Sequence, residues 1–142
     1  MNLDENSLIA ETSFNEIYKV QRKDNKQTYA ARIWKVPIII MDDTEKKYYQ
    51  NMLKIMQETS HPFVLKFIEE FVFKKKSHCI ITEFAPGGDL ESQIRNKSFT
   101  EDETMTYLTM LLLGLHYLHC KGIIHNDLKP QNISIDQLLD GF

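Results

Sequence analysis

Apolar and polar residues alternate in two runs near the start of the chain. One run is Ile17-Tyr18-Lys19-Val20-Gln21, and the other extends from Tyr29 to Trp34, with polar turns between them. A two-residue period is typical of β-strands that bury one face. We therefore predict three short strands within residues 7–34.

Apolar residues then recur at helical spacing. Within residues 42–58, Tyr48, Met52 and Met56 fall on one stripe, which predicts an amphipathic helix that packs through this stripe. His61-Pro62 follows, and proline disfavours helical backbone in the residue before it. The helix should therefore end before this pair.

The pattern changes at the break Ala85-Pro86-Gly87-Gly88. Before the break, we expect two more strands at roughly 64–73 and 78–84. After it, the spacing is helical. The fold class is therefore α+β, with a small sheet and one helix, then a hinge, then a helical half.

The best-defined helix is expected over residues 101–121. Thr100 is its predicted N-cap, Glu103 completes a capping box, and Gly122 follows as a C-terminal stop. Apolar residues occur on nearly every face of this helix, and such a helix is expected to be buried all round.

Composition narrows the class of protein. The net charge is −3, so no basic field favours nucleic acid, and the longest apolar stretch, around 107–118, is shorter than a membrane span of about 20 residues. The N-terminus has no apolar signal segment. Cys79 and Cys120 give no disulfide framework. We expect an intracellular, cytoplasmic protein that binds neither nucleic acid nor membrane.

Three residues near the end of the helix expected over residues 101–121 could be interpreted as metal ligands. His116 and His119 are one helical turn apart, and Cys120 is adjacent. Because no other ligand cluster accompanies them, we favour packing over metal binding.

The segment His125-Asn126-Asp127-Leu128-Lys129-Pro130-Gln131-Asn132 carries the strongest signal. It is similar to the H-R-D-L-K-P-x-N motif of protein kinases. Together with the order of the elements, it makes the whole chain resemble a partial protein kinase domain. The resemblance implies an antiparallel-sheet N-lobe over residues 1–84 and an incomplete helical C-lobe over residues 85–142.

The resemblance also implies roles for three residues of this segment. Asp127 would accept the proton of the substrate hydroxyl, Lys129 would steady the phosphate charge, and Asn132 would hold Mg²⁺ through its amide oxygen. Lysine two residues after the aspartate matches the serine/threonine pattern. The implied cofactors are ATP and Mg²⁺, and the implied partner is a protein substrate.

The resemblance also implies nucleotide contacts in the hinge and the strands. The Glu83 carbonyl and Ala85 N–H would bond adenine, Asp89 would reach the ribose, and Thr82 would be the gatekeeper. The apolar surface above adenine would come from Ile9, Ile17 and Ala30, and Arg32 would take the place of the phosphate-binding lysine. The Gly-Gly-Asp-Leu and Lys-Pro-Gln-Asn runs resemble the NIMA-related group.

Several positions depart from the family pattern. The glycine-rich loop G-x-G-x-x-G aligns with residues 10–15, which contain no glycine. Arg32 replaces the lysine, and Met52 stands where its glutamate partner is expected. Arginine keeps the charge but is a planar fork, so the replacement is not conservative. These changes predict that ATP and Mg²⁺ bind weakly.

Further departures lie in and after the motif. Asn126 replaces an arginine, and Ser134 stands where an apolar floor under adenine is usual. No D-F-G or A-P-E follows, and we interpret Asp140-Gly141-Phe142 as a coincidence. Three alternatives remain open: a kinase completed by sequence elsewhere in the gene, a pseudokinase that binds a protein partner, and a non-functional gene fragment.

Overall fold

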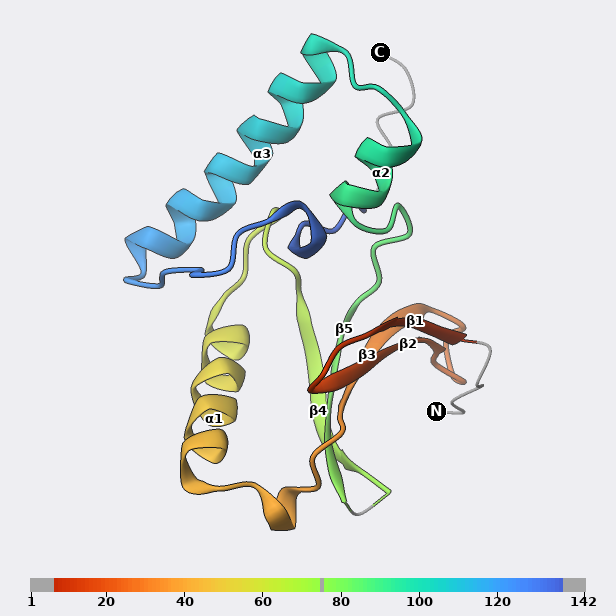
Figure 1. The fold of residues 1–142 in the computed structure, drawn as a ribbon, viewed down its shortest axis with the longest axis vertical. Helices are drawn as coiled ribbons and strands as arrows, with labels where there is room; N and C mark the ends of the chain where they lie inside the picture. The colour runs from red at the N-terminus through yellow and green to blue at the C-terminus, as the bar shows by residue number, and fades with distance from the viewer. Residues whose placement is uncertain (1–6, 75, 137–142) are drawn as a thin grey trace. The chain divides into compact units, whose positions relative to one another are not determined.

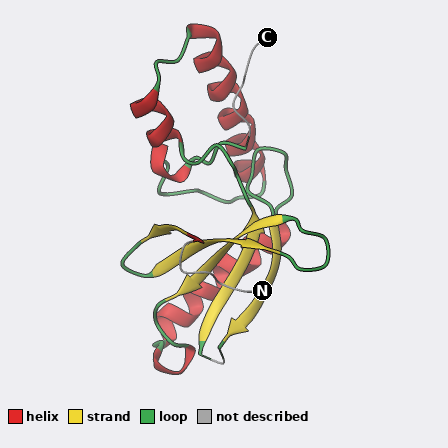
Figure 2. Ribbon diagram, turned by 90° about the vertical axis from the view of Figure 1, so that its right-hand side faces the viewer, coloured by secondary structure: helices red, strands yellow, loops and turns green. Residues whose placement is uncertain are grey.

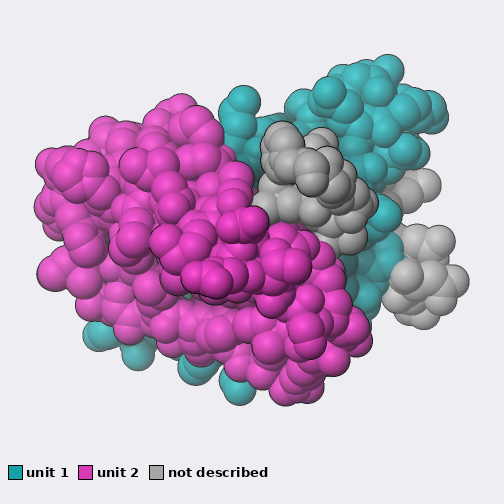
Figure 3. Space-filling model, turned by 90° about the horizontal axis from the view of Figure 1, so that it is seen from above, with its two compact units in different colours: residues 1–58, 66–84 teal, residues 59–65, 85–142 magenta. Residues whose placement is uncertain are grey.

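The structure, a computed structural model, describes residues 7–74 and 76–136 (Figure 1). The chain forms two compact units, coloured separately in Figure 3. Unit 1 comprises residues 1–58 and 66–84, and unit 2 comprises residues 59–65 and 85–142. The sequence prediction divided the chain between residues 84 and 85 and assigned 59–65 to the first region.

Unit 1 is built on a five-stranded antiparallel sheet (Figure 2). Its strand order is β1-β2-β3-β5-β4, so the late strand β5 lies between β3 and β4. The three strands predicted near the N-terminus and the two predicted before the hinge are all present. Their bounds are β1 Leu8–Glu11, β2 Asn15–Gln21, β3 Thr28–Trp34, β4 Phe67–Phe73 and β5 Ser77–Glu83.

The two faces of the sheet have separate apolar clusters. One face gathers buried residues such as Val20, Ala31 and Ile81. The other is covered by helix α1, Asp43–Glu58, which follows the short 3-10 turn η2, Ile38–Ile40. Apolar contacts between α1 and the sheet face that includes Ile80 therefore stabilise unit 1.

The stripe predicted for α1 is wrong by one residue at its first member. Tyr48 is 70% exposed, whereas Tyr49 is only 3% exposed. The Tyr49 hydroxyl donates to Glu70 Oε1 at 3.0 Å, and its ring stacks on His78 with centroids 3.7 Å apart. Stacking and a satisfied hydroxyl together explain why Tyr49 is buried. Met52 and Met56 pack inward as predicted.

Unit 2 contains α2, Leu90–Asn96, α3, Glu101–Cys120, and the 3-10 turn η3, Pro130–Asn132. The predicted capping box of α3 is confirmed, with Thr100 Oγ1 accepting from Glu103 N and Glu103 Oε2 accepting from Thr100 N. Gly122 ends the helix at φ +72°. This left-handed conformation is the one that favours glycine at a C-terminal stop.

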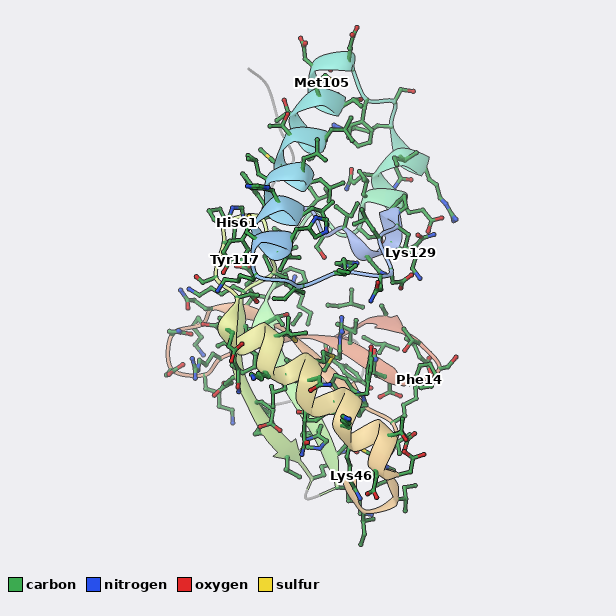
Figure 4. All side chains as sticks on the ribbon, turned by 90° about the vertical axis from the view of Figure 1, so that its left-hand side faces the viewer. Phe14, Lys46, His61, Met105, Tyr117 and Lys129 are labelled. Atoms are coloured by element: carbon green, nitrogen blue, oxygen red, sulfur yellow. The ribbon has the colours of Figure 1, made fainter. Side chains whose placement is uncertain are left out.

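The expectation that α3 is buried on every face is wrong. Only Gly114 and Leu118 are buried along it. On its packed side, a Cβ on Gly114 would lie 2.7 Å from the Phe63 carbonyl, and the Tyr117 hydroxyl accepts from Ser60 N at 2.8 Å. Tyr117 also stacks on His61 (Figure 4). Because segment 59–65 contacts one side, apolar residues elsewhere on α3 remain exposed.

No helix within residues 7–74 and 76–136 combines the length and apolar character that a membrane crossing requires.

Candidate functional site

The motif segment contains a hydrogen-bonded cluster of three side chains. Lys129 Nζ lies 2.9 Å from Asp127 Oδ2, and Asn132 Nδ2 donates to the same oxygen at 2.8 Å. Asn132 Nδ2 also donates to the Asp127 carbonyl at 2.9 Å, across the turn η3. The structure thus brings together the three residues predicted as catalytic. These bonds do not use the Asn132 Oδ1 atom.

The Asp127 carboxylate is exposed and held in its ionised form. The pKa of Asp127 lies below its usual value, first because Lys129 donates a hydrogen bond to it and then because Asn132 does. Donors and positive charge favour the carboxylate over the carboxylic acid. Such a group accepts a hydrogen bond from a hydroxyl readily, but it is a weak proton acceptor on its own.

The residue before it, Asn126, has a left-handed backbone conformation with φ +62°. Among non-glycine residues, asparagine adopts this region with comparatively little strain. The Asp127 N–H donates to the His125 carbonyl at 2.9 Å and closes this tight bend. The bend therefore provides a local reason for an asparagine here, which sequence reasoning had noted only as the loss of an arginine.

The chain that follows the cluster pairs with the glycines of the hinge. Gly87 N donates to Ile135 O at 2.8 Å, and Ile135 N donates to Gly88 O at 2.8 Å. A Cβ on Gly87 would lie 2.7 Å from Ile135 O, so only glycine fits this approach without a shift. The sequence showed these glycines as a turn signal, but it did not show their pairing partner.

Asp89 begins α2 as its N-cap. Its carboxylate accepts from Ser92 N at 2.8 Å and from Ser92 Oγ at 2.9 Å. The pKa of Asp89 is lowered, mainly by the bond from the Ser92 backbone. Asp89 also forms an isolated bridge with the exposed Ser134, the residue predicted at the adenine floor. Capping alone accounts for an aspartate here, so its ribose contact stays a prediction.

The loop between β1 and β2 is closed by Thr12. Thr12 Oγ1 accepts from Phe14 N at 3.2 Å and from Asn15 N at 3.0 Å, and Thr12 N donates to Asn15 O at 2.8 Å. No residue of segment 8–17 has a positive φ. This loop therefore does not need the missing glycines, and its two N–H groups are engaged by a hydroxyl. The sequence signal for this closure is a threonine whose hydroxyl can accept from the N–H groups two and three residues later. Sequence reasoning missed this signal.

The two acidic residues of this region have local partners. Glu11 pairs with Lys35 Nζ, and Glu16 Oε2 accepts from the Tyr18 hydroxyl at 2.9 Å. This ion pair joins Lys35, the residue after β3, to β1. The charge of Glu11 is thus partly balanced within unit 1.

Arg32 is partly buried on β3. Burial lowers the pKa of its guanidinium, and the nearby Tyr48 opposes this effect. Among the described residues no carboxylate forms an ion pair with Arg32. Met52, which stands at the expected glutamate position, packs against the apolar cluster of Trp34 and Ile80. Met52 thus supplies an apolar contact where the family's glutamate would supply a counter-charge.

The residues predicted around adenine share one sheet face in part. Ile17 pairs directly with Arg32, and Ala30 pairs with Thr82. Directly opposed and alternate residues of a sheet face the same side. Ile9 is exposed and lies at the irregularity in the β1 register.

The hinge residue Glu83 is anchored within unit 1. Its carboxylate accepts from Lys66 N at 2.7 Å, and its own N–H donates to Lys66 O at 3.0 Å. The Glu83 carbonyl accepts from Thr82 Oγ1 at 3.1 Å, and the Ala85 carbonyl accepts from Gly88 N at 3.3 Å. The adenine bonds expected at Glu83 O and Ala85 N stay predictions.

His116, His119 and Cys120 are all exposed, and Cys120 Sγ lies 3.6 Å from His116 Nε2. Within the described part of the chain, no three His, Cys, Asp or Glu side chains gather as a metal-binding group would. Asp140, Gly141 and Phe142, interpreted above as a coincidence, lie outside the described residues.

Comparison with known proteins identifies the family. The sequence model described as "Protein kinase domain" matches residues 3–140. The chain is 34% identical over 134 residues to ribosomal protein S6 kinase alpha-1 of Rattus norvegicus, covering 92% of this chain and 18% of that protein. It is 36% identical over 126 residues to serine/threonine-protein kinase N3 of Mus musculus, covering 87% and 14%. The chain thus spans less than a fifth of the length of either relative.

A solved structure shows the same fold. The crystal structure of Rad53 residues 1–466 in complex with AMP-PNP matches with a TM-score of 0.76 at 24% identity. The match covers 92% of this chain and 33% of that chain, and it confirms the predicted kinase-like α+β fold. Because the family's sequence model also matches nearly the whole chain, the chain belongs to the protein kinase family.

Proposed function

We propose that this chain is a serine/threonine protein kinase-like domain whose catalytic loop is assembled but whose grip on nucleotide phosphates is weak. The observation that supports the first part is the bonded cluster of Asp127, Lys129 and Asn132. Phosphoryl transfer depends mainly on positioning and charge neutralisation, and this cluster positions charges of both signs. The substrate class is a protein serine or threonine hydroxyl.

Each residue of the cluster has a distinct task in this proposal. Asp127, kept ionised by its neighbours, orients the substrate hydroxyl by accepting its hydrogen bond. Lys129 contributes positive charge beside the carboxylate and stabilises the transferred phosphoryl group. Asn132 offers its Oδ1 atom as a ligand. When bound, Mg²⁺ would neutralise phosphate charge and complete its coordination mainly through phosphates and water.

The proposed nucleotide is ATP, and the structurally similar Rad53 was crystallised with an ATP analogue, AMP-PNP. Weak binding is supported by two features of unit 1. Thr12 Oγ1 engages the N–H groups of Phe14 and Asn15, which therefore cannot donate to phosphate without breaking those bonds. Arg32 has no carboxylate partner to fix its orientation among the described residues.

The test is phosphate incorporation into a generic acceptor protein, with labelled ATP and magnesium. For the chain 1–142 we expect no incorporation above that of the Asp127→Asn variant. This variant keeps the size of the side chain and removes its negative charge. Asp127-dependent incorporation would contradict the proposed inactivity and would favour an active kinase.

A second candidate is a pseudokinase that binds a protein partner, and the closed β1–β2 loop favours it. In that case partner binding should persist in the Asp127→Asn variant. The proposed subgroup is the NIMA-related kinases, on the Gly-Gly-Asp-Leu and Lys-Pro-Gln-Asn runs alone.

A further inference from the structure

Unit 1 has a hollow of about 370 Å³ on the sheet face opposite helix α1. Two small side chains, Ala31 of β3 and Cys79 of β5, form its floor, and both are only 1% exposed. They are diagonal neighbours, because Ala31 pairs directly with Ile81 and Cys79 pairs directly with Ile33. The floor is low where these small side chains lie beside larger isoleucines.

This hollow is separate from the proposed nucleotide site. Ala31 stands between Ala30 and Arg32 in β3, and successive residues of a strand face opposite sides of the sheet. The side chains predicted at adenine and phosphate therefore face away from the hollow. All of its lining residues belong to unit 1, so the hollow is formed without any contribution from unit 2.

The wall of the hollow is apolar and partly aromatic. Phe71 and Phe73 of β4 line it and are half-buried. Burial raises the pKa of the Cys79 thiol to about 12, so this thiol stays protonated and adds an uncharged surface to the floor. Aromatic side chains pack well against a further aromatic ring. The volume lies near the lower end of the range for small-molecule sites, so a ligand with one or two rings would fit.

An ion pair at the edge of the hollow joins two distant parts of the sheet. Arg22, the residue after β2, has its Nη2 atom 3.3 Å from Glu69 Oε1 of β4. Two strands lie between β2 and β4 in the sheet order. The two side chains are 36% and 38% exposed, and ion pairs in contact with water are weak. This bridge can therefore open for a ligand that offers Arg22 another anion.

The charges around the hollow are unequally satisfied. Glu69 is paired with Arg22, and Asp24 Oδ1 accepts from Asn25 N at 2.8 Å and lies 3.8 Å from Arg22 Nε. Lys23 also lines the hollow, and no carboxylate among the described residues forms an ion pair with it. The charge that lacks a counter-ion is thus positive, and an anionic group would complement it.

We propose that this hollow is a binding site for a small aromatic carboxylate, whose ring packs on Ala31, Cys79 and Phe71 and whose carboxylate pairs with the Lys23 ammonium. Opening of the Arg22–Glu69 bridge gives the same carboxylate a second cation, a guanidinium that can bind it through two N–H groups. Because Arg32 faces the other side of the sheet, the ligand binds whether or not ATP is present.

Isothermal titration calorimetry of the chain 1–142 with naphthalene-2-carboxylate tests the proposal. One molecule should bind saturably, and naphthalene-2-carboxamide, which has the same rings without the charge, should bind about tenfold more weakly. Saturating ATP should leave the affinity unchanged. The absence of saturable binding, equal affinity for the amide, or competition by ATP would each overturn the proposal.

Charge variants test the role of Lys23. Lys23→Gln should weaken binding of naphthalene-2-carboxylate by about fivefold. The matched control is Lys26→Gln, which makes the same change in net charge in the same turn but away from the hollow, and it should leave the affinity unchanged. Glu69→Gln should strengthen binding, because it releases the Arg22 guanidinium. Equal losses in the two lysine variants would reduce the effect to net charge and overturn the site. Circular dichroism checks that each variant is folded.

Backbone amide NMR locates the bound ligand. Naphthalene-2-carboxylate should shift the amide signals of residues 22–24 and 71–73, and these shifts should be smaller in Lys23→Gln at the same ligand concentration. The signals of α3 should stay unchanged. Shifts confined to α3, or to Ala30 and Arg32, would place the ligand elsewhere and overturn the proposal.

Discussion

In the catalytic loop, Lys129 and Asn132 hold the Asp127 carboxylate at the surface, charged and exposed. In the β1–β2 loop, polar groups turn toward each other instead, because the Thr12 hydroxyl engages the backbone N–H groups of Phe14 and Asn15. Both loops are ordered by hydrogen bonds between residues close in sequence. They differ in the groups that a ligand could bind: the catalytic loop exposes a carboxylate, whereas the two N–H groups of the β1–β2 loop are already bonded.

Departures from a family motif thus have unequal consequences in the two loops. Asn126 replaces an arginine of the catalytic motif, yet it has a positive φ, which asparagine adopts more often than most other residues. Loss of glycine at residues 10, 12 and 15 accompanies a loop that satisfies its own donors. The first change leaves the Asp127 cluster in place, whereas the second accompanies a loop whose Phe14 and Asn15 N–H groups are already bonded to Thr12.

The catalytic loop should be most sensitive at the glycine that anchors the chain after it. Gly87→Ala would place a Cβ 2.7 Å from Ile135 O, and we expect the free energy of unfolding to fall by about 3 kcal/mol. Gly88→Ala is the matched control, because its new Cβ would have no atom within 4 Å. Its only cost is an alanine at the positive φ of +72°. It should lower stability by about 1–2 kcal/mol. Urea denaturation of both variants measures the difference, and equal losses would contradict the close approach.

The β1–β2 loop should respond in the opposite sense. Thr12→Gly removes the hydroxyl that engages the two N–H groups, and we expect the affinity for ATP to rise by about fivefold, the equivalent of roughly one hydrogen bond. Thr12→Val removes the hydroxyl but keeps the branched side chain, so its gain should be smaller. Equilibrium binding of a fluorescent ATP analogue measures both. Unchanged affinity in Thr12→Gly would mean that Thr12 does not limit phosphate binding.

The smallest effect should be the titration of Asp127. Its folded pKa is lowered, so its contribution to stability is present above the unfolded pKa and is lost as pH falls through the folded pKa. Lys129→Met removes the largest cause and should raise the pKa of Asp127 toward its usual value. Lys47→Met, on α1, should leave it unchanged. Carboxyl-carbon NMR measures the pKa, and no change in Lys129→Met would argue against the ion pair.

Local signals explain which parts of the fold could be predicted. The capping box at Thr100 and Glu103 and the alternation in β2 and β3 depend on neighbours in sequence, and the structure confirms them. Tyr49 was missed because its burial depends on Glu70 and His78 of distant strands. The exposure of α3 was missed because an apolar sequence does not reveal how many neighbours surround it.

The same limit applies to the candidate site. The resemblance to the family motif implied roles for Asp127, Lys129 and Asn132, and the structure brings these residues together because they are close in sequence. The motif could not reveal that Gly87 pairs with Ile135, a residue far along the chain. The ion pair of Glu11 with Lys35 likewise depends on how the strands are paired, which alternation does not fix, whereas Glu16 bonds Tyr18 of its own strand.

Isothermal titration calorimetry of the chain with ATP, in the presence and absence of magnesium, distinguishes an assembled catalytic loop with weak phosphate binding from a complete nucleotide site. We propose the first. It predicts weak binding that magnesium hardly changes, because the hinge is present but the groups around the phosphates are not arranged to hold them. Micromolar affinity that strengthens with magnesium would contradict the account.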